Sequence, residues 1–158
     1  MPSNIWGSQF RNAPTSPKVC CRLKMTMSKP IIYHLYVNYE DTDFSGFVYH
    51  ANYLKFCERA RSDYLRVKGV DQKAMFAKGV AFVVRRMDCN FLQPARFEDE
   101  LTVETDFKEM AGARFELFQS VMRGKTTLFT AAVTVVLIDG KGRPKRIPSD
   151  LAAALTHP

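Results

Sequence analysis

The spacing of apolar and polar residues divides the chain into one long helix among strands. From Ile31 to Tyr39 the chain is rich in β-branched and aromatic residues, and its apolar positions partly alternate (Ile31, Tyr33, Leu35, Val37 and Tyr39), which predicts a strand. Residues 51–68 carry apolar side chains every three or four positions, which predicts an amphipathic helix of about 27 Å that ends at Gly69. The predicted apolar face of this helix consists of Tyr53, Phe56, Cys57, Ala60, Tyr64 and Val67.

The rest of the chain has mostly the pattern of strands. Alternating apolar and polar residues predict strands at 80–92, 101–108 and 115–121, and short helices are predicted at 71–78 and 148–155. The segment from Leu128 to Ile138 is apolar in both alternating sets, which predicts a central strand covered on both faces. One long helix cannot form the layers of a doubly wound fold. The predicted class is therefore α+β, an antiparallel sheet of five strands wrapped around a single central helix.

The N-terminal 29 residues differ in composition from the remainder. They contain scattered Pro, Ser, Gly and Asn without apolar periodicity, which predicts a disordered extension at 1–29 and one domain at 30–158. A translation start at Met25 or Met27 remains open. A targeting helix is disfavoured because Pro14 and Pro17 interrupt it.

The net charge of +7 comes mainly from this extension. It holds five Lys and Arg and no acid, so residues 30–158 carry 18 cations against 16 acids. This balance argues against nucleic acid or an anionic membrane as partner. No apolar run approaches the roughly 18 residues that span a bilayer, so no membrane span is predicted.

The cysteines and histidines do not form a recognisable metal site. Cys20, Cys21, Cys57 and Cys89 include no C-x-x-C pair, and the three histidines are scattered. We therefore predict no metal, and a reducing, cytoplasmic location.

The segment between the first strand and the long helix carries the candidate chemistry. It places Asp41, Asp43 and Gly46 at a helix start, where free backbone N–H groups stabilise negative charge. The residues alone leave several interpretations open: turn capping, a D-x-D metal motif, or an acid–base pair of Asp43 with His50 as in a hydratase. A calcium loop of the EF-hand type is disfavoured, because Asn52 replaces the required Glu.

Beyond these local patterns, the segment shows a family resemblance. It runs Tyr39-Glu40-Asp41-Thr42, then Asp43-x-x-Gly46-x-Val48-Tyr49-His50-x-Asn52-Tyr53. This run resembles the active-site signature of the 4-hydroxybenzoyl-CoA thioesterase family of hotdog-fold enzymes, and within it the Tol-Pal-associated acyl-CoA thioesterases of bacteria. The resemblance continues through Phe82-Val83-Val84 and the stretch from Phe91 to Val103, and it covers about residues 31–155.

The resemblance implies a hotdog domain that hydrolyses acyl-CoA, assembled as a homo-oligomer of dimers or dimers of dimers. It implies no metal or redox cofactor, since coenzyme A is part of the substrate. Asp43 matches the nucleophile or general base, and the backbone N–H of His50 matches the donor to the thioester oxygen. The His50 side chain is the alternative for that position, through proton transfer. Asp41 matches an acidic position without an assigned role.

Some assignments stay open. The cations that meet the nucleotide phosphates cannot be chosen among Arg85, Arg86, Arg96 and Lys145. Aromatic residues on a helical face usually pack, so we expect packing roles for Tyr49, Tyr53 and Tyr64. Two rival functions remain: a hotdog hydratase or dehydratase, and a non-catalytic module that binds acyl carrier protein. Thioesters of acyl carrier protein also remain a second substrate class.

Overall fold

The computed structural model describes residues 30–156, so the predicted extension at 1–29, Cys20, Cys21 and His157 lie outside the described part. In chain order the elements are β1 (Ile31–Tyr36), the 3-10 helix η1 (Tyr39–Asp41), α1 (His50–Val67), α2 (Gln72–Ala77), β2 (Val80–Phe91), β3 (Glu100–Ala111), β4 (Arg114–Arg123), β5 (Thr126–Asp139) and α3 (Ser149–Thr156). The long helix, both short helices and all five strands lie where the sequence pattern predicts them, within a few residues.

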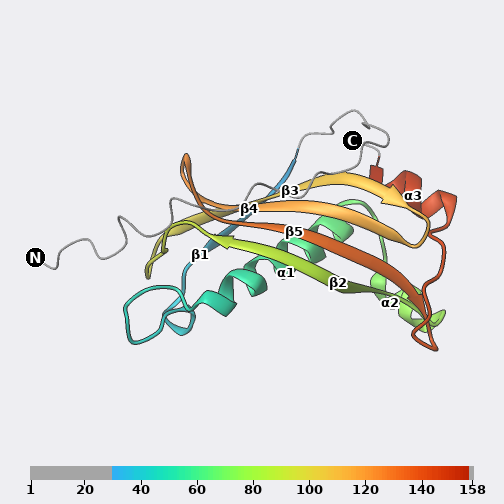
Figure 1. Cartoon of the computed structure of the whole chain (residues 1–158), viewed down its shortest axis with the longest axis horizontal. Helices are drawn as coiled ribbons and strands as arrows, with labels where there is room; N and C mark the ends of the chain where they lie inside the picture. Colours follow the sequence, from blue (N-terminus) through green and yellow to red (C-terminus); the bar gives the residue numbers. More distant parts are fainter. Residues whose placement is uncertain (1–29, 157–158) are drawn as a thin grey trace, which may run out of the picture.

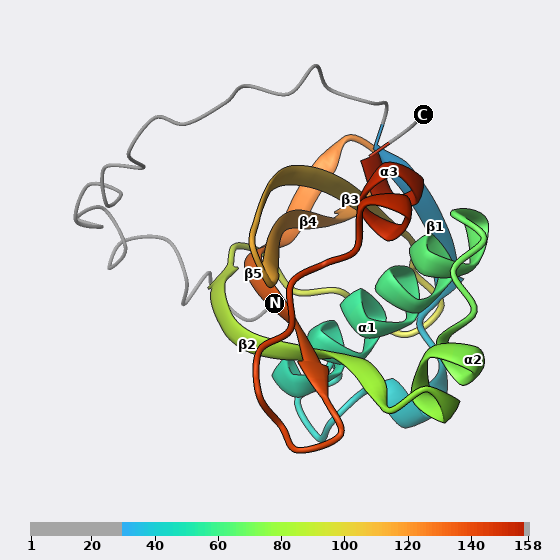
Figure 2. The same ribbon diagram turned by 90° about the vertical axis from the view of Figure 1, so that its right-hand side faces the viewer.

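The five strands form one antiparallel sheet in the order β1-β3-β4-β5-β2. The sheet curves around α1, which lies along its concave side (Figure 1). Seen along the helix, the strands surround much of α1 (Figure 2). The predicted α+β hotdog arrangement is confirmed. The β1–α1 connection lies at one end of the molecule, and α2 and α3 lie at the other (Figure 1).

The buried face of α1 follows the predicted spacing with four exceptions: Val67 is exposed, and Asn52, Arg61 and Leu65 are buried although they lie outside the predicted apolar face. Tyr53, Phe56 and Tyr64 are buried as expected. Val67 was expected in the core but is 64% exposed, because it is the last residue of α1, next to the turn that leaves the helix. Arg61 is a charged residue outside the predicted apolar face, yet it is only 8% exposed. Its position three residues before Tyr64 puts it on the buried side of the helix.

A buried polar network explains how the core accepts Arg61. The guanidinium donates to Gln119 Oε1 at 2.8 Å and pairs with the carboxylate of Glu58. The side-chain amide of Gln119 in turn donates to Thr105 Oγ1 and to the backbone carbonyl of Cys57. The network ties α1 to β3 and β4, and it leaves no buried side-chain polar atom without a partner in the described residues.

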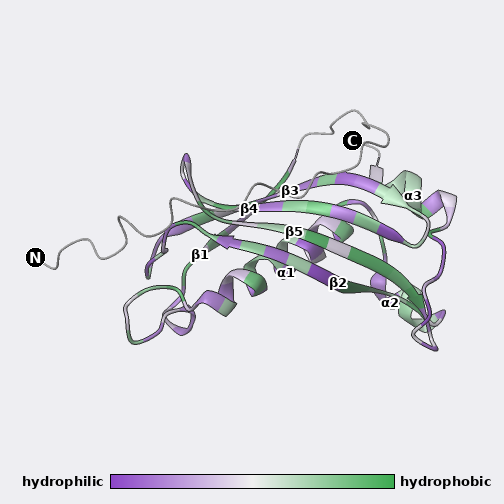
Figure 3. Ribbon diagram, viewed as in Figure 1, coloured by the Kyte–Doolittle hydropathy of each residue, from purple (hydrophilic) through white to green (hydrophobic). Residues whose placement is uncertain are grey.

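The prediction that β5 is covered on both faces holds only in part for a single chain: Leu128 and Val136 in the second alternating set are buried, but the middle of that set is not. Phe129, Ala131 and Val133 are buried on the face toward α1, whereas Ala132 on the opposite face is exposed. No second layer packs over this part of the sheet within residues 30–156. The hydropathy colouring nevertheless shows an apolar β5 over much of its length (Figure 3). The outer face of the sheet is thus partly apolar and open to solvent.

Candidate active site

The first strand is shorter than predicted, and this shapes the loop that follows. β1 ends at Tyr36 rather than Tyr39, because the chain turns into η1. The Asn38 amide donates to Oδ2 of the buried Asp41 at 2.9 Å. The Asp41 carbonyl accepts from the Tyr49 amide and from the side-chain amide of Asn52, both at 2.9 Å. Asp41 and Asn52 therefore anchor the loop to the first turn of α1.

Asp43 lies on the exposed part of this loop, and Ser45 holds its carboxylate. Asp43 Oδ1 accepts hydrogen bonds from the Ser45 amide, at 2.8 Å, and from the Ser45 hydroxyl. The loop turns back at Gly46, whose φ of +76° is the left-handed conformation that glycine adopts without strain. The Ser45 hydroxyl and then the Ser45 amide lower the pKa of Asp43 more than partial desolvation raises it, and His50 adds a smaller lowering. The carboxylate is therefore ionised at neutral pH.

His50 is the first residue of α1, one position earlier than predicted. The first amides of a helix have no partner within the helix, and no backbone hydrogen bond within residues 30–156 uses the His50 amide. This N–H is thus available to an oxygen that gains negative charge. The His50 side chain is exposed, and its ring lies 4.4 Å from the ring of Tyr49 and 6.2 Å from that of Phe91.

The expected packing roles hold for two of the three tyrosines. Tyr53 and Tyr64 are both 3% exposed, and the Tyr53 hydroxyl accepts a hydrogen bond from the Ala95 amide at 2.8 Å. The Ala95 carbonyl accepts a hydrogen bond from the Val48 amide. The segment before β3 is therefore bonded to the loop that precedes α1. Tyr49 is 46% exposed, which contradicts its predicted packing role. As the N-cap of α1 it precedes the helical face, so the periodicity does not apply to it.

Aromatic rings form the floor beside the helix start. The ring of Phe91 lies 5.9 Å from that of Tyr53 and 5.0 Å from that of Phe129, and Tyr53 and Phe129 stack at 5.3 Å. Phe91 is nevertheless 52% exposed and therefore offers apolar surface next to His50. This floor suits the hydrophobic part of a substrate rather than its charged part.

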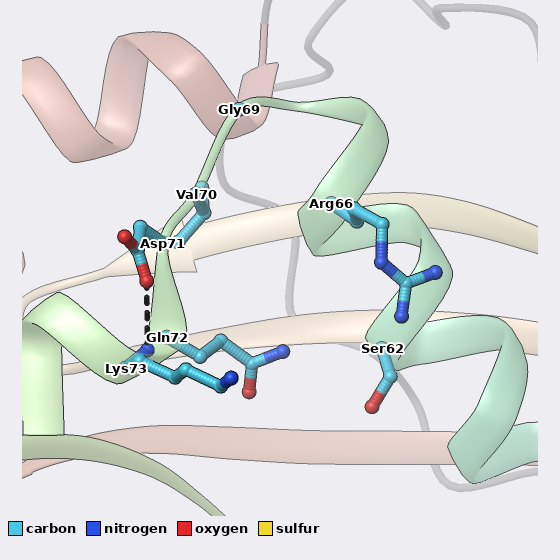
Figure 4. A pocket seen from close by; sticks show the side chains of 7 residues that line it. All are labelled: Ser62, Arg66, Gly69, Val70, Asp71, Gln72 and Lys73. Carbon is cyan, nitrogen blue, oxygen red and sulfur yellow. Dashed lines mark hydrogen bonds between the residues drawn. The ribbon is translucent and has the colours of Figure 1, made fainter.

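The Asp43–His50 region is exposed surface in the part of a single chain that the structure describes. Both residues are exposed, and Phe44 between them is fully exposed. Three hollows lie elsewhere, and neither Asp43 nor His50 lines any of them. One of about 380 Å³ lies where α1 passes into α2, with the side chains of Arg66, Gln72 and Lys73 around it (Figure 4). A second of about 670 Å³ adjoins α3, and a third of about 60 Å³ lies between α1 and the sheet.

The four cations considered for the nucleotide phosphates lie on different elements. Arg96 is the one beside the candidate site, with its guanidinium carbon 4.6 Å from the centre of the Phe47 ring. Arg85 and Arg86 lie on β2, and Lys145 lies in the connection from β5 to α3.

Metal and thiol chemistry find no support in the described part. Within residues 30–156, no group of three or more His, Cys, Asp or Glu is arranged to hold a metal ion. Burial raises the pKa of Cys57 to about 12, so this thiol stays protonated and is a poor nucleophile at neutral pH. None of the helices in this range combines the length and apolar character needed to cross a bilayer.

Two contributors to the site were not singled out from the sequence. Ser45 donates hydrogen bonds to the Asp43 carboxylate. The sequence contains a signal for this contact, because an Asp side chain often accepts a hydrogen bond from the backbone amide two residues later in a turn. Phe91 reaches His50 from β2, 41 residues away in the chain, and local spacing gives no signal for such a contact.

Comparisons with known proteins match the region that contains this site. The family model described as thioesterase-like superfamily matches residues 37–155. The acyl-CoA thioester hydrolase YbgC of Escherichia coli is 41% identical over 119 residues, which are 74% of this chain and 89% of that protein. The acyl-CoA thioesterase YbgC of Haemophilus influenzae is 41% identical over 123 residues, 77% and 90% of the two chains. The crystal structure of a probable thioesterase from Bartonella henselae has a TM-score of 0.72 at 41% identity and covers 75% of this chain and 99% of its own.

Proposed function

The chain belongs to the thioesterase-like superfamily, and from this membership we propose that it hydrolyses the thioester bond of an acyl-CoA to a free acid and coenzyme A. Relatives at 41% identity that carry acyl-CoA thioesterase names support the substrate class, and the predicted membership of the thioesterase family is confirmed. One observation carries the mechanism: an ionised carboxylate, Asp43, and an unused helix-start N–H, that of His50, lie in one short loop–helix junction.

In the proposed mechanism Asp43 acts on the thioester carbonyl carbon, either by direct attack or by taking a proton from the attacking water. The carbonyl oxygen gains negative charge in both routes, and the His50 N–H donates to it. One preorganised donor of this kind contributes about 10²–10³ in rate. The sulfur then leaves with the electron pair of the C–S bond as the thiolate of coenzyme A. In the direct route the acyl group is now held on Asp43 as a mixed anhydride, and water cleaves that anhydride to the free acid and the regenerated carboxylate. Since this thiolate is a good leaving group, no strong general acid is required.

The reaction as proposed draws on the carboxylate, the amide and water alone. Coenzyme A enters as part of the substrate, so no redox cofactor or metal has a step to perform. Cys57 and Cys89 are free thiols, which is consistent with our proposal of a reducing, cytoplasmic location.

A thiol-release assay tests the proposed function. We expect acyl-CoA of a suitable chain length to release one free thiol per molecule consumed, detected with a chromogenic disulfide. A hydratase would consume enoyl-CoA without releasing thiol, and a non-catalytic carrier-protein module would release none from any substrate. Running the same series on thioesters of acyl carrier protein decides which of the two carriers the enzyme prefers.

We also propose that a second copy of the chain completes the site through the edge of β2. β2 is the last strand of the sheet, and its outer edge has no partner strand within residues 30–156. Val83, Val84, Phe91 and Leu92 on or next to it are 37–56% exposed. An unpaired apolar edge of this length favours pairing with another strand. Because Phe91 also borders His50, a partner bound here would cover the open Asp43–His50 surface.

Substituting Val84→Lys tests this interface. We expect the variant to shift from oligomer to monomer at micromolar concentration. The new lysine lies next to Arg85 and Arg86, and pairing two copies of β2 would bring these like charges together. We also expect the variant to lose most of its activity. The matched control is Ile32→Lys on β1, the opposite edge of the sheet, where the native side chain is similarly exposed at 49%. Sedimentation velocity gives the oligomeric state of both variants, and thiol release gives their activity. A Val84→Lys variant that remains oligomeric and active would remove the β2 edge from the assembly.

A further inference from the structure

The hydrogen bonds around Asp43 distinguish its two carboxylate oxygens. Within residues 30–156, both donors that reach the Asp43 side chain, the amide and the hydroxyl of Ser45, bind Oδ1. Oδ2 has no donor from this part of the chain. An ionised carboxylate accepts hydrogen bonds at both oxygens, so the uneven arrangement leaves Oδ2 as the oxygen that is free to react.

The direction of the Ser45 hydroxyl is also fixed. The Phe47 amide points to Ser45 Oγ, at 3.4 Å, and thereby uses the acceptor side of that oxygen. An ionised carboxylate cannot donate, so the hydrogen between Ser45 and Asp43 comes from the serine hydroxyl. The Asp43 amide donates to the Phe47 carbonyl at 3.0 Å, and the Gly46 amide donates to the Asp43 carbonyl at 3.0 Å. The main chain on both sides of the carboxylate is therefore held in the same turn.

From this geometry we infer that Ser45 is a positioning residue of the thioesterase reaction: it holds Asp43 through Oδ1 and presents Oδ2 to the thioester. The inference rests on the proposed function, in which Asp43 reacts. Either Oδ2 forms the new bond to the carbonyl carbon, or it takes the proton of the attacking water. The C–S bond breaks in both cases, and the electron pair leaves with sulfur as the thiolate of coenzyme A. In the first case water then breaks the bond between Oδ2 and the acyl group, which frees the acid and restores the carboxylate.

Ser45 also acts on the ionisation of Asp43. Its hydroxyl is the largest cause of the lowered pKa of Asp43, and its amide is the next. The other titratable groups around the loop are His50 at the start of α1, Glu40 and Asp41 in η1, and Arg96 beside Phe47. A substitution at Ser45 leaves all four in place, so a change in the titration of Asp43 reports the loss of the serine donor.

The decisive variants are Ser45→Ala, which removes the hydroxyl, and Ser45→Thr, which keeps it. Ser45 is exposed, so neither change disturbs a packed core. In Ser45→Ala we expect kcat at high pH to fall about threefold to tenfold, the fold-change typical of one lost hydrogen bond, with KM unchanged. We also expect the acid limb of the kcat/KM profile to move to higher pH, because Asp43 must be ionised and its pKa rises without the hydroxyl. Ser45→Thr restores both quantities.

The matched control is Thr42→Ala, next to Asp43 in the same loop. The Thr42 hydroxyl donates to the Tyr39 carbonyl rather than to the carboxylate, so the acid limb stays where it is in the wild type. If Ser45→Ala lowers kcat at high pH but leaves the acid limb of the kcat/KM profile in place, Ser45 has only a structural role. If Ser45→Ala matches the wild type in both quantities, the inference is overturned.

A measurement without turnover separates this inference from the proposed function. Carbon-13 NMR titration of the Asp43 carboxyl group in the substrate-free protein reports its pKa directly, and we expect it to be higher in Ser45→Ala than in the wild type. Should the wild type release no thiol from any acyl-CoA, the proposed function fails. Should an Asp43→Asn variant keep normal activity, Asp43 is not the reacting group, and the reactive role of Oδ2 fails with it. Should Asp43→Asn be inactive while Ser45→Ala leaves the titration and the pH profile unchanged, only the role of Ser45 is lost.

Discussion

The variant Asp43→Asn is expected to lose a factor on the order of 10²–10⁴ in kcat, while its fold and its affinity for acyl-CoA change little. Asparagine has nearly the shape of aspartate, and its carbonyl oxygen still accepts the Ser45 amide and hydroxyl that bind Oδ1. It lacks the negative charge, so it can neither attack the thioester carbonyl nor deprotonate water. The loss should therefore appear in kcat rather than in KM.

The measurement is steady-state thiol release, with chemical denaturation as a check on folding. Asp63→Asn is the matched control, since it removes a carboxylate from an exposed ion pair with Arg66 on α1, far along the helix from the loop. We expect this control to retain wild-type turnover, because such surface pairs contribute little to stability. Asp43→Asn turnover within a few-fold of the wild type would take Asp43 out of the mechanism.

The sequence predicted the architecture because the signals for α1 and the strands are local and repeated. The stripe from Tyr53 to Tyr64 follows the helical period over several turns, and a strand such as β3 alternates over its length. The count of one long helix and five strands then left few possible layer arrangements. The candidate site was predicted for a different reason, which was the family signature around Asp43 and His50.

The errors arose where tertiary packing outweighs local pattern. Arg61 is buried although it is charged, because Gln119, 58 residues away in the chain, supplies its acceptor. The open middle of β5 at Ala132 cannot be read from its apolar composition, since apolar strands are covered either by the same chain or by another copy. The hydrogen bonds from Ser45 to the Asp43 carboxylate depend on the backbone conformation of the turn at residues 43–46. The sequence indicates that a turn is present but does not specify this conformation.

The second large effect is expected from His50→Pro, which removes the backbone N–H at the start of α1. Proline is favoured at the first position of a helix, and the fold does not use the His50 amide within residues 30–156. Tyr49, with φ −60° and ψ 130°, already has the conformation that a residue before proline adopts. The variant should therefore fold normally and lose about 10²–10³ in kcat, as expected for one missing oxyanion donor.

His50→Ala is the comparison that separates the amide from the imidazole. Alanine keeps the N–H and removes the ring, so we expect its kcat to stay within tenfold of the wild type, whereas the proline variant loses at least ten times more. Circular dichroism of both variants verifies that α1 is intact, and thiol-release kinetics give the two values of kcat. Equal losses in the two variants would assign the contribution to the imidazole side chain, and unchanged turnover in His50→Pro would show that the thioester oxygen is stabilised elsewhere.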